Sequence, residues 1–263
     1  MRTRKKLAIA TWSAPREPNI YGKLTVDVTK ALAYIEELRE VSGLRVTMTH
    51  LVGKAVAKGL EATPDLNGRI VFGRFVPFET LDLAFLVSLD GGDDLAKAKI
   101  SGIDRKSVLD IARELDEMVG SLRAGQDESF NQSKQLLRVM PVWAIRWLVR
   151  ATGFATGGLG LDASKMGLEP FPFGTCIITS MGSLGVDEGW APPTPFARVP
   201  LYVLVGAVRK APAVKDGKVV ATDQMTLCAT IDHRFIDGYH GAAVARVTRA
   251  ALEDPYEQLG PPR

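Results

Sequence analysis

A stretch near the carboxyl end of the chain, residues 230–238, sets the strongest constraint on how this sequence folds. The segment before it, 225–231, is mostly apolar and is typical of a buried strand. The segment after it, 239–253, carries apolar residues at helical spacing. Between the two lies a polar stretch that contains His233, Arg234 and Asp237. A strand is therefore expected to end, and a helix to begin, around a histidine that rigid elements hold within reach of solvent.

Composition narrows the class of protein. The 263 residues are 46% hydrophobic and 24% charged, which is enough to bury a substantial core, and we expect one domain over 1–263. The formal net charge is only +3, and basic residues are not interleaved with aromatics, so nucleic acid is not an expected partner. Cys176 and Cys228 lie in apolar runs and form no C-x-x-C pair, which predicts buried free thiols, no metal site and a cytoplasmic location. No signal peptide is expected at the basic N-terminus.

Hydrophobic periodicity predicts strands and helices along the whole chain. Residues 1–23 are expected to be irregular, 91–94 to form a turn and 125–133 to form a polar linker. The pair Asp216-Gly217 predicts a tight hairpin turn within 214–220. Strands are expected at 23–28, 70–72, 81–87, 95–100, 174–180, 201–208 and 225–231, and helices at 29–42, 49–62, 104–123 and 239–253.

The segment 136–161 is strongly apolar, yet it carries arginines at positions 138, 146 and 150. These charges interrupt any apolar run long enough to cross a membrane. A helix is predicted here, ended by the glycines between 153 and 160. Three roles remain open for it. In the first, the helix packs on the domain core or on a neighbouring subunit. In the second, it contacts a membrane surface through 136–152 with its Trp and Arg side chains. In the third, it covers the active site as a lid.

The motif at 232–238, Asp-His-Arg-Phe-Ile-Asp-Gly, resembles the D-H-R-x-x-D-G signature of the catalytic domain of dihydrolipoamide acyltransferases, the core components of 2-oxo acid dehydrogenase complexes. It is also similar to the H-x-x-x-D-G element of chloramphenicol acetyltransferase. Four further stretches resemble the family in the same order, at 26–29, 54–67, 104–107 and 174–185. The resemblance implies a chloramphenicol acetyltransferase-like fold. This is an α/β (α+β two-layer sandwich) architecture with a mixed sheet flanked by helices, and it forms trimers.

The resemblance also implies the chemistry, which is acyl transfer between two thiols. A thiol has a pKa near 8.5, so a base is needed to form the thiolate at neutral pH. His233 is implied to be that base, and Asp237 to brace its loop. The oxyanion donor is implied at Thr179, with Ser180 as the alternative if the register shifts by one. Substrate-binding roles are implied for Ser180, Gly182, Arg234 and Gly238.

Partners and cofactors follow from the same resemblance. It implies a homotrimer with the active site between subunits, the histidine from one chain and the hydroxyl from the next. Coenzyme A would be a substrate, no metal is implied, and a lipoyl group would be supplied in trans, because no lipoyl or peripheral-subunit-binding domain is recognised. The segment at about 134–172 is expected to be an apolar, Trp/Arg-rich helical insertion. The last residues, 258–263, do not resemble the apolar tail that joins trimers into cages, so a free trimer is expected.

Two functions remain open at this point. The first is a stand-alone acyltransferase, which His233, Asp237 and the hydroxyl at position 179 favour. The second is a catalytically inactive or diverged scaffold or assembly protein that retains the trimeric fold. Two observations favour this second function. The run 89–99 departs from a channel-lining segment of the family, and no lipoyl domain is recognised.

Overall fold

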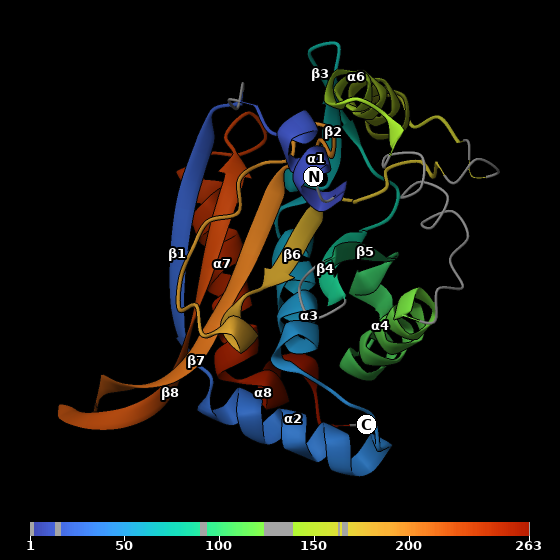
Figure 1. The fold of residues 1–263 in the computed structure, drawn as a ribbon. Helices are drawn as coiled ribbons and strands as arrows, with labels where there is room; N and C mark the ends of the chain where they lie inside the picture. Colours follow the sequence, from blue (N-terminus) through green and yellow to red (C-terminus); the bar gives the residue numbers. More distant parts are fainter. Residues whose placement is uncertain are drawn as a thin grey trace.

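A six-stranded mixed sheet forms the centre of the computed structural model, which describes residues 3–13, 17–89, 94–123, 139–162, 164 and 168–262. The strand order is β1-β8-β7-β6-β4-β5 (Figure 1). β6 runs parallel to both β4 and β7, and the other neighbouring pairs are antiparallel. The strands are β1 (Asn19–Asp27), β4 (Leu83–Leu89), β5 (Asp94–Ile100), β6 (Cys176–Ser180), β7 (Leu201–Lys215) and β8 (Lys218–Asp232). A separate hairpin pairs β2 (Gly68–Val71) with β3 (Arg74–Pro77).

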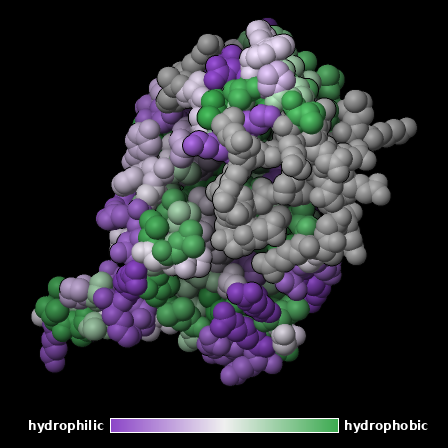
Figure 2. Space-filling view, viewed as in Figure 1, coloured by the Kyte–Doolittle hydropathy of each residue, from purple (hydrophilic) through white to green (hydrophobic). Residues whose placement is uncertain are grey.

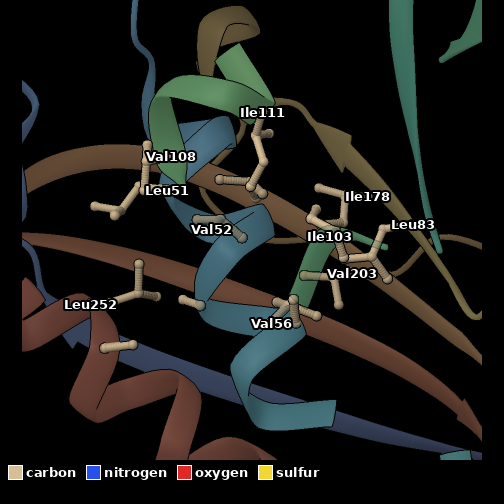
Figure 3. Packing of buried hydrophobic residues seen from close by; sticks show 14 of the residues in the cluster. Leu51, Val52, Val56, Leu83, Ile103, Val108, Ile111, Ile178, Val203 and Leu252 are labelled. Atoms are coloured by element: carbon tan, nitrogen blue, oxygen red, sulfur yellow. The ribbon is translucent and has the colours of Figure 1, made fainter. Parts of the chain in front are cut away.

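One face of the sheet is covered by helices (Figure 1). They are α2 (Thr29–Ser42), α3 (Met48–Glu61), α4 (Val108–Arg123), α7 (Gly238–Glu253) and α8 (Pro255–Leu259). The main core lies between α3 and the sheet, where Val52 and Val56 approach Ile178 and Val203 (Figure 3). A smaller cluster lies on the other face of the sheet and contains Ala84, Ile177, Ala197, Val199 and Tyr202. The predicted mixed sheet flanked by helices is therefore confirmed.

Most local predictions hold within a few residues. The hairpin turn at Asp216-Gly217 joins β7 to β8. Ser107 and Asp110 exchange hydrogen bonds at the start of α4: Ser107 N–H donates to Asp110 Oδ2 at 3.0 Å, and Asp110 N–H donates to Ser107 Oγ at 3.1 Å. A short turn of 3-10 helix, η3 (Ile103–Arg105), precedes α4, and two others are η1 (Pro64–Leu66) and η6 (Gly182–Leu184). The predicted linker 125–133 and most of the predicted turn 91–94 lie outside the described residues.

Two local predictions are wrong, and packing between distant segments explains both. Residues 3–11 form a helix, α1 (Thr3–Thr11), because they pack on α6 (Val142–Thr152), far away in sequence. Helical structure also continues past Gly153 as a π-helical stretch, η4 (Gly153–Gly158). A Cβ at Gly153 would lie 2.7 Å from the carbonyl oxygen of Phe196, so this glycine permits close packing rather than ending the helix. Among the described residues, none of the helices is long and apolar enough to cross a membrane.

His50 is part of the structure of the α3 N-terminus. Its Nδ1 accepts a hydrogen bond from the backbone N–H of Thr47 at 3.2 Å, which requires the neutral ring. Burial lowers the pKa of His50 from its ordinary value of 6.5 to about 4. Between these two pH values the unfolded chain binds more protons than the folded chain. The stability that neutral His50 contributes is therefore present above pH 6.5 and is lost as the pH falls toward 4.

We expect the free energy of unfolding to decrease by at most about 3 kcal/mol from this group over that interval. The control is His50→Gln, because glutamine at the third helical position suits a capping box with threonine and does not titrate. Urea unfolding of both proteins between pH 7 and pH 4 measures the difference. Equal pH slopes in the wild type and the variant would contradict the expectation.

Candidate active site

His233 lies in the turn that follows β8, and backbone contacts fix its position. Its N–H donates to the carbonyl oxygen of Pro18 at 2.8 Å, and Phe235 N–H donates to the carbonyl oxygen of Asp232 at 3.1 Å. The ring atom Nδ1 lies 2.6 Å from the carbonyl oxygen of Ile236. A carbonyl oxygen can only accept, so the neutral ring carries its proton on Nδ1 and keeps the lone pair on Nε2. The residue is exposed, and the arrangement can therefore supply a base to a molecule arriving from solvent.

Arg234 is occupied by its neighbours in the chain. Its Nε donates to Asp232 Oδ1 at 2.9 Å, its backbone N–H donates to the same oxygen at 3.0 Å, and its Nη2 lies 3.7 Å from Glu17 Oε1. The hydrogen bond to Asp232 raises the pKa of Arg234 further above its ordinary value. Asp232 is buried, so its charge needs this partner. The predicted substrate-binding residue Arg234 thus has a positioning role that holds the turn, which leaves less of its guanidinium for a substrate.

Asp237 caps the first turn of α7. Its Oδ1 accepts from the backbone N–H groups of Tyr239 at 2.9 Å and His240 at 3.2 Å, and it lies 2.8 Å from Nδ1 of His240. These bonds, with the backbone N–H of His240 first, hold the pKa of Asp237 below its ordinary value. Asp237 therefore braces the loop through the start of the helix, while the carbonyl of Ile236 orients the imidazole. Gly238 is the first residue of α7.

Thr179 and Ser180 end strand β6 and point to opposite faces of the sheet. Cys176 and Ile178 belong to the core beneath the helices, and Ile177 belongs to the cluster on the other face. Side chains alternate along a strand, so Thr179 shares the face of Ile177 and Ser180 shares the helix-covered face. Both are half-buried. The hydroxyl that is directed away from the helix layer is that of Thr179.

Gly182, the other glycine predicted to touch substrate, serves packing. A Cβ at this position would lie 2.5 Å from the carbonyl oxygen of Gly206 in β7, closer than real Cβ atoms come to backbone. The turn after β6 therefore needs a glycine in order to lie against β7.

His233 and Thr179 are not brought together within one chain. Thr179 pairs with Leu204, and Leu204 pairs with Cys228, five residues before the histidine. Thr179 and His233 are therefore separated by about 16 Å along the direction of β8 and by two strand spacings, of roughly 5 Å each, across the sheet. In a single chain the histidine and the hydroxyl cannot act on one thioester.

Sequence reasoning missed several contacts of the histidine turn. Glu17 and Pro18 reach it from more than 200 positions away, and no local pattern signals such a contact. Phe75 of the β2–β3 hairpin meets Phe235 with ring centroids 6.1 Å apart, which packs the hairpin against the turn. Asp232 could have been found, because an acid beside an arginine in one short motif indicates an ion pair.

The chain is similar to relatives of known sequence and known structure. The acetyltransferase component of the pyruvate dehydrogenase complex from Zymomonas mobilis is 24% identical over 93% of this chain, and the chain spans 47% of that protein, about half its length. Among solved structures, the cubic core of the pyruvate dehydrogenase multienzyme complex superposes with a TM-score of 0.69 at 21% identity, over 97% of this chain and 88% of the other.

Two further solved structures are relevant. Azotobacter vinelandii dihydrolipoamide acetyltransferase superposes with a TM-score of 0.68 at 21% identity, over 93% of this chain and 85% of the other. Chloramphenicol acetyltransferase shares the fold at a TM-score of 0.50 and 11% identity, over 96% and 95% of the two chains.

The family model of the 2-oxoacid dehydrogenases acyltransferase (catalytic domain) matches residues 2–133 and 161–259 and skips 134–160, which lies within the expected insertion. The match covers most of the chain, including β1 to α4 and β6 to α8. The chain therefore belongs to the family of 2-oxoacid dehydrogenase acyltransferase catalytic domains.

Proposed function

We propose that this domain transfers an acyl group between two thiols, coenzyme A and a dihydrolipoyl group or a similar acceptor, with His233 as the general base. One observation carries the proposal. The contact of 2.6 Å between His233 Nδ1 and the carbonyl oxygen of Ile236 selects the tautomer whose Nε2 can accept a proton. The Azotobacter vinelandii structure supports it, because that work investigated the role of a serine, a histidine and an asparagine in the catalytic mechanism of an acetyltransferase.

The proposed reaction conserves the proton. Nε2 of His233 takes the proton of the attacking thiol, and the thiolate forms a bond to the carbonyl carbon of the thioester. The oxyanion of the tetrahedral intermediate accepts a hydrogen bond from a hydroxyl, which we assign to Thr179. The intermediate then collapses with cleavage of the original carbon–sulfur bond. The leaving thiolate receives the proton back from the imidazolium of His233.

The separation of His233 from Thr179 supports a homotrimer with its sites between subunits. The face of the sheet that bears Thr179 lies opposite the helix layer, where a second copy can bring its own histidine turn. The similarity to cores of multienzyme complexes is consistent with such an assembly. A lipoyl group carried by another protein would be the natural acceptor in this arrangement.

Thioester formation from acetyl-CoA and dihydrolipoamide tests the function. We expect the purified chain to catalyse this transfer. The release of free coenzyme A and the formation of acetyl-dihydrolipoamide measure the rate. A set of acyl chains of increasing length should be compared in the same assay. Failure to transfer any of them to dihydrolipoamide or to other small thiols would reject the proposal.

The scaffold alternative receives less support. A diverged scaffold has no need for a histidine ring whose Nδ1 is held by a carbonyl oxygen at an exposed turn.

A further inference from the structure

The outer side of α6 carries two tryptophans that no part of the described chain covers. Trp143 and Trp147 have 70% and 69% of their surface exposed, whereas Ile145 between them is fully buried. One residue advances an α-helix by about 100°, so residues four apart share a side. Arg146 and Arg150 fall within the same arc of about 100° as the two tryptophans. The outer side of α6 is therefore a ridge of Trp and Arg, opposite the side that packs inward.

The ridge is held rigidly on the domain. Arg146 donates from Nε to the carbonyl oxygen of Ala10 at 3.3 Å and from Nη2 to that of Ile9 at 3.0 Å, which caps the C-terminus of α1. The ring of Phe154 in η4 meets that of Phe72, at the tip of the β2–β3 hairpin, with centroids 6.1 Å apart. α1, α6 and the hairpin thus form one end of the molecule, and α2 lies at the opposite end (Figure 1).

Other apolar side chains extend the ridge. Figure 2 shows hydrophobic surface beside hydrophilic surface at this end of the molecule. Exposed apolar residues in α1, η4 and the hairpin tip, or directly after the two helical elements, are Ile9 (46%), Trp12 (41%), Phe72 (81%), Phe154 (37%) and Leu159 (39%). Such a gathering of large apolar side chains at one end marks an interaction surface.

The charge of α1 and α6 and the exposure of the two tryptophans indicate what kind of partner this face binds. α1 contains Lys5, α6 contains Arg146 and Arg150, and neither helix contains an aspartate or a glutamate. A second copy that docked through the same face would place these positive charges against each other, and a trimer contact that pairs this face with a different one is distinguished by the oligomer measurement below. The two tryptophans are exposed side chains that do not line the cavity between the β2–β3 hairpin and η4. A flat, deformable and anionic surface meets both conditions.

We propose that the face formed by α1, α6, η4 and the β2–β3 hairpin tip binds an anionic lipid bilayer. Indole rings favour the boundary between headgroups and acyl chains, and arginine and lysine favour anionic headgroups. The helix lies in the plane of the interface and does not cross it. This surface adjoins the His233 turn, because Phe75 of the same hairpin meets Phe235, but the proposal does not depend on acyl transfer.

Co-sedimentation of the full chain with vesicles tests the proposal. We expect it to pellet with vesicles made of equal parts phosphatidylcholine and phosphatidylglycerol, and much less with pure phosphatidylcholine. Trp143→Ala/Trp147→Ala should weaken the partition coefficient by about tenfold or more, and Trp143→Phe/Trp147→Phe should retain most of it. Arg150→Glu and higher salt should each weaken it as well.

The matched control is Val41→Ala, which removes exposed apolar surface from helix α2 at the opposite end of the molecule. It should bind vesicles as the wild type does. Thermal unfolding of the Trp variant checks its fold, and we expect little change because both side chains are mostly exposed. Absence of wild-type binding, or equal binding by the Trp pair variant, would overturn the proposal. So would a smaller oligomer in the Trp variant by analytical ultracentrifugation, because the ridge would then be a contact between copies.

Discussion

His233→Ala should lower the rate of acyl transfer by a factor of about 10² to 10⁴, the usual contribution of a general base. The variant removes the only atom in the turn that the proposed reaction uses to accept the thiol proton. The fold should survive, because the turn is also held by Arg234 with Asp232 and by Asp237 at the start of α7. Steady-state thioester formation measures the loss, and far-UV circular dichroism with ultracentrifugation confirms that the assembly is intact.

A mixing experiment extends this prediction to the site between subunits. Thr179→Ala keeps its histidine, and His233→Ala keeps its hydroxyl, so each protein alone lacks one half of every site. If the two are unfolded together and refolded as random mixed trimers, one interface in four combines an intact histidine with an intact hydroxyl. We expect recovery of about a quarter of the wild-type activity.

Recovery fails if both groups come from one chain, because no mixed interface then restores a site. If Thr179 has no catalytic part, Thr179→Ala alone retains full activity, and the mixture gives about half of it, because half of the histidines are intact. The matching pair His233→Ala with Ser180→Ala distinguishes the two hydroxyls at the end of β6. Recovery with Ser180→Ala in place of Thr179→Ala would transfer the role to Ser180.

Gly174→Ala should give a large loss of stability, at least about 3 kcal/mol. Gly174 has φ +62°, in the left-handed region that disfavours a side chain. A Cβ there would also lie 2.2 Å from the carbonyl oxygen of Asp82, which is backbone and cannot rotate away. The same carbonyl accepts from Thr175 N–H at 2.8 Å, so the clash falls where β6 begins to align with β4. Thermal unfolding should show a midpoint lowered by roughly 6–12 °C.

Gly102→Ala is the matched control. Gly102 has φ +59°, close to that of Gly174, but a Cβ at this position would have no neighbouring atom within 4 Å. It should cost only the backbone strain, about 1–2 kcal/mol. The difference between the two variants isolates the close approach to Asp82. Equal losses in both proteins would show that the steric clash at Gly174 relaxes without cost.

Local patterns were reliable where local physics decides the structure. Alternation and helical spacing predicted the strands of the sheet and the four longest helices near it, because burial of one face requires that periodicity. Asp216-Gly217 predicted the hairpin turn, and Ser107 with Asp110 predicted the start of α4, because turn and cap chemistry involve residues only a few positions apart.

The sequence by itself determined the strand, polar turn and helix around His233, and through the motif at 232–238 and four further stretches it pointed to the acyltransferase family. Tertiary structure alone decided how that turn is held. Pro18 and Glu17 meet it from the other end of the chain, and Phe75 meets it from the hairpin. It also decided that α1 is a helix, that helical structure continues past Gly153, and that Trp143 and Trp147 face outward. Each of these depends on contacts between residues far apart in sequence, whose partners no local periodicity can specify.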